Sequence, residues 1–132
     1  MNKFVARLAD GGLIKGATFD FSPAKEAFHI TEPAPNPGAN STLVHTGDLK
    51  ALFFVRDFDG DPDYVEEKEF SAPLDPSERR IGVTFRDGET LVGTTPMYRP
   101  ALPGFFLVPA DPRSNNERCY VVEAATREVR LL

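Results

Sequence analysis

The acidic stretch DFDGDPDYVEEKE, residues 57–69, has the densest grouping of potential ligand atoms in this 132-residue sequence. Its alternating carboxylates could hold a hard cation such as Ca²⁺, which takes several oxygen ligands. These carboxylates belong to Asp57, Asp59, Asp61 and Asp63. A calcium loop between two helices needs Gly at its sixth position and Glu at its twelfth, where this stretch has Pro62 and Lys68. We therefore favour a solvated connector that its like charges keep extended, with a calcium site as the weaker alternative.

A second group of candidate ligand-binding side chains lies in the loop sequence PADPRSNNER, residues 109–118. Guanidinium and amide groups donate hydrogen bonds, so this loop could hold an anion or a carbonyl group. Ser and Asn also hydrogen-bond to their own backbone in turns, and we favour that interpretation. The candidate binding residues of this loop are Arg113, Asn115, Asn116 and Arg118.

The stretch PMYRPALPGFF, residues 96–106, holds much apolar material for a loop. It could cover the open end of its own domain, cover a seam with the rest of the chain, or dock a partner protein. The candidate contact residues of this stretch are Tyr98, Arg99 and Leu102.

The residue types that commonly act as nucleophiles or zinc ligands are few. Cys119 lies in a predicted strand, and a thiol needs a nearby basic group before it becomes a nucleophile. His29 stands between Phe28 and Ile30, so in a strand it points away from the core. Two histidines, His29 and His45, make a poor zinc site, since zinc typically takes four ligands. From the sequence we therefore expect a protein that is not an enzyme, with no catalytic residue and no cofactor.

The strands that must position these side chains follow from a pattern that occurs twice, as DGGLIKGAT at 10–18 and DGETLVGTT at 87–95. Asp-Gly favours a tight hairpin, because Gly readily takes the positive φ that such turns need. Apolar residues alternate before each turn, as in a half-buried strand. They are Phe4, Ala6 and Leu8 in the first occurrence and Ile81, Val83 and Phe85 in the second. Gly16 and Gly93 then predict a bulge or a sharp bend in the next strand.

The correspondence continues beyond the hairpins, with Phe28 aligned to Phe105 at the same spacing. A spacing shorter by one residue then aligns Leu43 with Cys119 and Lys50 with Thr126. We therefore predict an all-β protein with a tandem duplication of a five-stranded Sm/SH3-like small barrel, the two barrels packed together. The first repeat spans 1–56, the acidic connector 57–76 and the second repeat 77–132. The alternative is one irregular β-sandwich in which two Asp-Gly turns coincide by chance.

The composition sets limits on the location and on the partners. The net charge of −5 is local, since 13 acids and 14 bases remain outside residues 57–69. A globally basic surface for nucleic acid is therefore not indicated. The single cysteine allows no intrachain disulfide, which favours a reducing compartment. We find no apolar run long enough for a signal peptide or a membrane helix and expect a cytoplasmic protein.

Four segments together resemble a bacterial domain family of unknown function that is found alone or beside signalling domains. They are the KALFFV strand, the FRDGETLVG hairpin, PGFFLVPAD and SNNERCYVV. The resemblance covers nearly the whole chain, implies an Sm-like β fold and implies no activity. Similarity to RNA-binding Sm proteins is weaker. Gly16 and Asp20 match the start of their first motif, but its RNA-contacting Asn and the Arg-Gly pair of the second motif are missing.

We expect a non-enzymatic binding or regulatory module that contacts another protein in bacterial signalling. The alternative is an Sm-like protein that binds single-stranded RNA.

Overall fold

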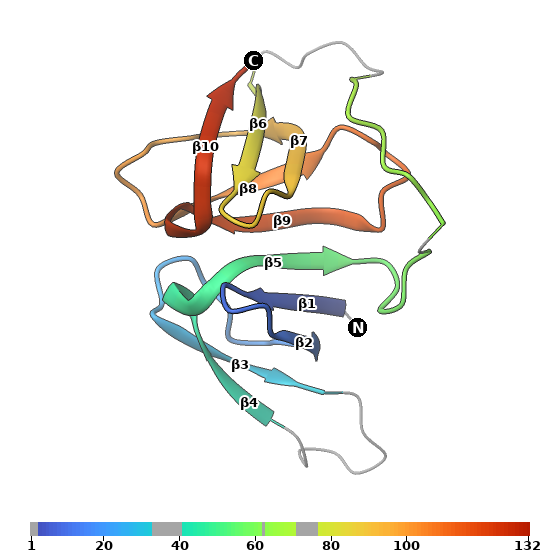
Figure 1. Cartoon of the computed structure of the whole chain (residues 1–132). Helices are drawn as coiled ribbons and strands as arrows, with labels where there is room; N and C mark the ends of the chain where they lie inside the picture. Colours follow the sequence, from blue (N-terminus) through green and yellow to red (C-terminus); the bar gives the residue numbers. More distant parts are fainter. Residues whose placement is uncertain (1–2, 33–40, 62, 71–76) are drawn as a thin grey trace.

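The strands form two groups of five, one in each half of the chain (Figure 1). The structure is a computed structural model that describes residues 3–32, 41–61, 63–70 and 77–132. The first half has β1 (Lys3–Leu8), β2 (Leu13–Gly16), β3 (Ala27–Thr31), β4 (Ser41–His45) and β5 (Leu49–Val55). The second half has β6 (Arg79–Phe85), β7 (Thr90–Thr95), β8 (Gly104–Pro109), β9 (Asn116–Val122) and β10 (Thr126–Leu131). The all-β class is confirmed.

Short 3₁₀ turns precede the last strand of each half: η1 (Thr46–Asp48) before β5 and η2 (Glu123–Ala125) before β10. These turns are the only helical elements of the described residues, and no helix there could cross a membrane.

One antiparallel sheet of eight strands runs through both halves in the order β10-β6-β7-β8-β9-β5-β1-β2. β3 and β4 form a second sheet, which is joined to the end of β2 by a bridge between Ala17 and Thr31. β5 and β9 lie side by side at the middle of the molecule, where the two halves meet (Figure 1). The described strands form open sheets and do not close into barrels. In place of two separate closed barrels, a continuous sheet crosses the boundary between the halves.

Strand pairing recurs between the halves at one constant offset in residue number. It is the offset that separates the two Asp-Gly pairs of the sequence, and we call it the Asp-Gly offset. Phe28 pairs with Val44, and at the Asp-Gly offset Phe105 pairs with Val121. The pairings of β1 with β2 and with β5 recur at the same offset in β6, β7 and β10.

The shift of one residue predicted for the last two strands is therefore wrong. At the Asp-Gly offset Leu43 corresponds to Tyr120 and Lys50 to Arg127. Cys119 stands at the place of Thr42, not of Leu43.

The two Asp-Gly turns have the same backbone geometry. Gly11 and Gly88 have φ angles of 98° and 94°, which a residue with a side chain rarely adopts. The Asp10 carboxylate accepts a hydrogen bond from the Gly12 N–H at 2.8 Å, and Asp87 accepts one from Glu89 at 3.0 Å. The hairpins therefore form where the Asp-Gly pairs predict them.

Gly16 and Gly93 allow two strands to approach closely. A Cβ atom on Gly16 would lie 2.3 Å from the carbonyl oxygen of Thr31, and one on Gly93 would lie 2.0 Å from that of Val108. Within each half the register shifts lie elsewhere, between Arg7 and Leu8 and after Thr126. The bulge predicted at these glycines is thus replaced by a close contact with the backbone of the next strand.

Two apolar cores lie on the two faces of the central strands. In β5, Phe53 faces one core and Leu52 the other. In β9, Cys119 and Tyr120 divide in the same way. The first core contains most of the buried residues of the second half, together with Val5 and part of β5. Because each core takes residues from both halves, the halves stabilise each other.

The acidic connector is largely exposed but is attached to the second half by hydrogen bonds. The Tyr64 hydroxyl donates to the Asp111 carboxylate, which also accepts the Glu67 N–H at 2.9 Å. The Ser114 hydroxyl donates to the Glu66 carboxylate. The connector is therefore docked on the loop between β8 and β9, an attachment that the prediction of a solvated connector did not include. Residues 62 and 71–76 lie outside the described residues.

Candidate functional site

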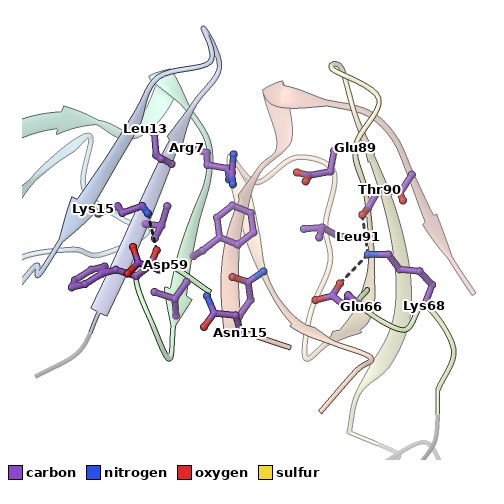
Figure 2. A pocket seen from close by; sticks show the side chains of 15 residues that line it. Arg7, Leu13, Lys15, Asp59, Glu66, Lys68, Glu89, Thr90, Leu91 and Asn115 are labelled. Atoms are coloured by element: carbon purple, nitrogen blue, oxygen red, sulfur yellow. Dashed lines mark hydrogen bonds and ion pairs between the residues drawn. The ribbon is translucent and has the colours of Figure 1, made fainter. Parts of the chain in front are cut away.

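A cleft of about 330 Å³ lies between the two halves, where the connector passes from β5 toward β6 (Figure 2). Strands of both halves and the connector line it. Its apolar floor contains Val5 of β1, Phe53 of β5 and Leu91 of β7. Val5 and Phe53 are direct partners across the β1–β5 ladder, so their side chains lie on one face. The floor is thus a margin of the core that the halves share, and these three side chains are themselves buried.

The first-half wall of the cleft is cationic. Arg7 follows Val5 by two residues, so it lies on the same face of β1, and Lys15 is the cross-strand partner of Val5 on β2. The Lys15 ammonium donates to the carbonyl oxygen of Phe58 at 2.7 Å. Arg7 is exposed, and its guanidinium has no hydrogen-bond or ion-pair partner among the described residues. It is therefore available to a ligand.

The opposite wall is mainly acidic. Glu89, at the end of the β6–β7 turn, and Glu66, in the connector, line the second-half side. Lys68 partly neutralises the charge of Glu66, since its ammonium group lies 2.8 Å from the Glu66 carboxylate. Glu89 lies at the same end of the cleft as Arg7, on the opposite wall (Figure 2).

A buried ammonium group supports Glu89 from the β5 side of the interface. Lys50 is 8% exposed, and its Nζ lies 2.5 Å from Glu89 Oε1 and 2.7 Å from Asp87 Oδ2. The same ammonium lies 4.7 Å from the centroid of the Phe85 ring, where a cation is attracted by the π electrons. The hydrogen bond from Lys50 is the main cause that lowers the pKa of Asp87. This contact fixes the β6–β7 turn against the first half.

The candidates at the start of β9 and in the loop before it do not converge on one site. Asn115 and Asn116 line the cleft. The amide of Asn115 donates to the carbonyl of Asp57 at 2.8 Å and accepts its N–H at 3.0 Å, so it holds the connector. Arg118 instead lies over aromatic rings, 4.3 Å from the centroid of Phe54. Arg113 is exposed and does not line the cleft.

The apolar stretch between β7 and β8 also lies outside the cleft. The ring of Tyr98 packs edge-on against Phe105 with centroids 4.9 Å apart, and its hydroxyl donates to Glu123 at 3.0 Å. Burial, and then this hydrogen bond, raise the pKa of Tyr98. Arg99 and Leu102 are exposed. Tyr98 therefore covers its own half, while Leu102 remains accessible.

The aspartates considered for calcium bind their own backbone. Asp57 accepts the N–H of Asp59 at 3.0 Å, and Asp61 accepts that of Asp63 at the same distance. Within the described ranges, no group of three His, Cys, Asp or Glu residues is placed to hold a metal ion.

The cysteine and the histidines lie apart from the cleft lining. Cys119 is buried, and burial raises the pKa of its thiol. His29 is exposed, and its Nδ1 donates to Asp20 Oδ2 at 2.8 Å. This hydrogen bond is the main cause that lowers the pKa of Asp20 to about 2. His45 is exposed at the end of β4.

The sequence reasoning missed the charged residues of the cleft, chiefly Arg7, Lys15 and Glu89. A signal for them was present. In β1 and β2 these cations alternate with Ala6 and Ile14, so they face away from the core of the first half. Which other element faces them depends on how the two halves meet.

Comparison with known proteins identifies the family of the chain. No curated protein and no solved structure matches it. A family model described as "Family of unknown function (DUF6982)" matches residues 1–132, so the chain belongs to this family.

Proposed function

We propose that the protein is a non-enzymatic binding module that holds an extended segment of a partner protein in the cleft between its halves. The observation that carries this proposal is the accessible Arg7 guanidinium beside an apolar floor, opposite the acidic wall that contains Glu89. Binding sites combine apolar surface with polar groups that orient the ligand. Most residues that line this cleft are polar or charged, which favours a charged ligand.

The cleft suits a ligand with both signs of charge. An apolar side chain of the ligand would cover Phe53 and Leu91, which form part of the floor. A ligand carboxylate would pair with Arg7, because a guanidinium binds carboxylates through two parallel hydrogen bonds. A lysine or arginine of the ligand would face Glu89 or Asp59. Such a ligand is a peptide segment in which an apolar residue stands between an acid and a base.

RNA binding has less support as the alternative. A polyanion gains affinity by pairing its phosphates with cations. Here Glu66 already pairs with Lys68, one of the cations that line the cleft, and Asp59, Glu66 and Glu89 would repel a phosphate backbone.

We also propose that the halves arose by duplication of one Sm/SH3-like unit. The constant Asp-Gly offset between equivalent strand pairs supports this, as does a 3₁₀ turn before the last strand of each half. On this proposal the cleft is a product of the duplication, because neither half alone has both walls.

Selection from a peptide library displayed on phage tests the function. We expect selected peptides to combine an acidic, an apolar and a basic residue, and Arg7→Glu to weaken their binding about tenfold or more. Arg99→Glu, a charge reversal at an exposed site outside the cleft, is the matched control and should leave binding unchanged. Equal binding by wild type and Arg7→Glu would refute the cleft. Salt-sensitive binding of homopolymer RNA without peptide binding would favour the alternative.

A further inference from the structure

The contact between the halves pairs the last strand of the first half with the fourth strand of the second half. β5 and β9 run antiparallel, with Phe53 opposite Cys119 and Leu52 opposite Tyr120. The Asp-Gly offset relates β5 to β10 and β4 to β9. The first half therefore has its own equivalent of β9, and the second half its own equivalent of β5.

These two equivalents are strands with a free edge. Among the described strands, β10 pairs only with β6, and β4 pairs only with β3. Such an edge presents unpaired N–H and C=O groups to another strand. Leu43 on β4 and Leu131 on β10 are half exposed, at 50% and 53%.

We propose that β10 of one molecule pairs with β4 of a second copy of this chain, in the register of the β5–β9 contact. The register follows when each residue is replaced by its equivalent in the other half. Phe53 is equivalent to Arg130, and Cys119 to Thr42, so Arg130 lies opposite Thr42 of the second copy, as Phe53 lies opposite Cys119. The same replacement places Val129 opposite Leu43 of the second copy, as Leu52 stands opposite Tyr120.

The charges at this contact are complementary. Within the chain, Lys50 of β5 pairs with Asp87 of the turn in the second half. The equivalent of Lys50 is Arg127, and the equivalent of Asp87 is Asp10 in the first half, so the cation and the carboxylate are both present. Arg127 is exposed and has no partner among the described residues. In the proposed contact Arg127 reaches Asp10 of the second copy.

The association is weaker than the contact within the chain and is reversible. β5 has buried apolar side chains on both faces, whereas β10 has Arg127, Glu128 and Arg130 exposed. The contact is also head-to-tail, because it joins two different edges. An open assembly then always keeps one free β4 at one end and one free β10 at the other, so growth ends only in a closed ring.

Cysteine cross-linking tests the register. Opposite residues of an antiparallel pair have Cα atoms about 4.5–5.5 Å apart, which suits a disulfide. We expect a mixture of the single variants Thr42→Cys and Arg130→Cys to give an oxidised dimer. Glu128→Cys, two residues away on β10, should cross-link less to Thr42→Cys because diagonal Cα atoms lie about 7–8 Å apart. Wild type should not cross-link because Cys119 is buried. No dimer in the mixture, or an equal dimer with Thr42→Cys alone, would overturn the proposal.

A charge exchange provides a second test. Sedimentation velocity of the wild type should show oligomers that increase with protein concentration. Arg127→Glu should weaken this association about tenfold or more, and adding Asp10→Lys to the same chain should restore it. Arg99→Glu is the control with an unchanged association. A wild type that stays monomeric at millimolar concentration, or a double variant weaker than Arg127→Glu, would refute the contact.

Discussion

The ammonium group of Lys50 on β5 lies 2.7 Å from the carboxylate of Asp87, the first residue of the second Asp-Gly turn. The two side chains differ in exposure, with 10% of the Lys50 side chain and 54% of the Asp87 side chain accessible to solvent. The turn therefore does more than reverse the chain between β6 and β7. It supplies the counter-charge for a cation that the first half buries at the interface.

This ion pair predicts a dependence of stability on pH. The pKa of Asp87 in the folded protein lies below its ordinary value of 3.8, mainly because of the hydrogen bond from Lys50. A carboxyl group whose pKa is lowered by folding stabilises the fold at pH values above its pKa in the unfolded chain. This contribution is lost as the pH falls through the pKa of the folded protein. We expect Lys50→Met to reduce the difference in melting temperature between pH 7 and pH 3. Lys25→Met, at an exposed lysine, should keep the wild-type difference.

Gly93 should tolerate no side chain. The Cβ atom added by Gly93→Ala would lie 2.0 Å from the carbonyl oxygen of Val108, so β7 and β8 would have to separate. We expect a loss of about 3 kcal/mol in the free energy of unfolding, measured with urea. Gly47→Ala is the matched control, because no atom lies within 4 Å of its added Cβ. Similar values for the two variants would contradict the close approach of the strands.

Tyr98 and Leu102 should behave differently although they lie in the same loop. Tyr98 packs against Phe105 and donates a hydrogen bond to Glu123, whereas Leu102 is 38% exposed. Tyr98→Ala should therefore reduce the free energy of unfolding by about 2 kcal/mol, and Leu102→Ala by less than about 0.5 kcal/mol. Chemical denaturation of both variants checks this. A partner that docks on the loop is tested better with Leu102→Ala, since that variant keeps its stability.

Local patterns predicted much of the fold. The Asp-Gly turns depend on two residues and the alternation of β1 and β6 on a few more, so both can be read from short windows of sequence. The pairing of β5 with β9 joins strands that lie far apart in the sequence, and no local pattern selects that partner. One sign of it was present. The run LKALFFV has apolar side chains at successive positions, which is typical of a strand buried on both faces.

The candidate site was less predictable, because its residues come from separate elements. Arg7 and Glu89 belong to different halves, and they approach only because β5 pairs with β9. The error in aligning Leu43 had another cause. The sequences of the last two strands of each half are only weakly similar, so they could be aligned with an error of one residue. The strand pairing in the structure gives the correct alignment. The prediction for the connector considered its repulsive charges, whereas the groups that bind it belong to Asp111, Ser114 and Asn115 in the loop before β9.

The last prediction concerns Asp111, which is 5% exposed and holds the connector through Tyr64 and Glu67. The hydrogen bond to Asp111 is the main cause that raises the pKa of Tyr64 to about 12. A phenol group whose pKa is raised by folding stabilises the fold at pH values below its unfolded pKa of 10.0. This contribution is lost as the pH rises through about 12.

Asp111→Asn removes the charge that holds the Tyr64 proton. We expect the pKa of Tyr64, followed by NMR, to fall toward 10.0. We also expect faster hydrogen exchange at the Glu67 amide, since a neutral amide oxygen is a weaker acceptor than a carboxylate. Asp63→Asn changes an exposed carboxylate in the same connector and should alter neither quantity. Unchanged values in Asp111→Asn would mean that the connector does not depend on this loop.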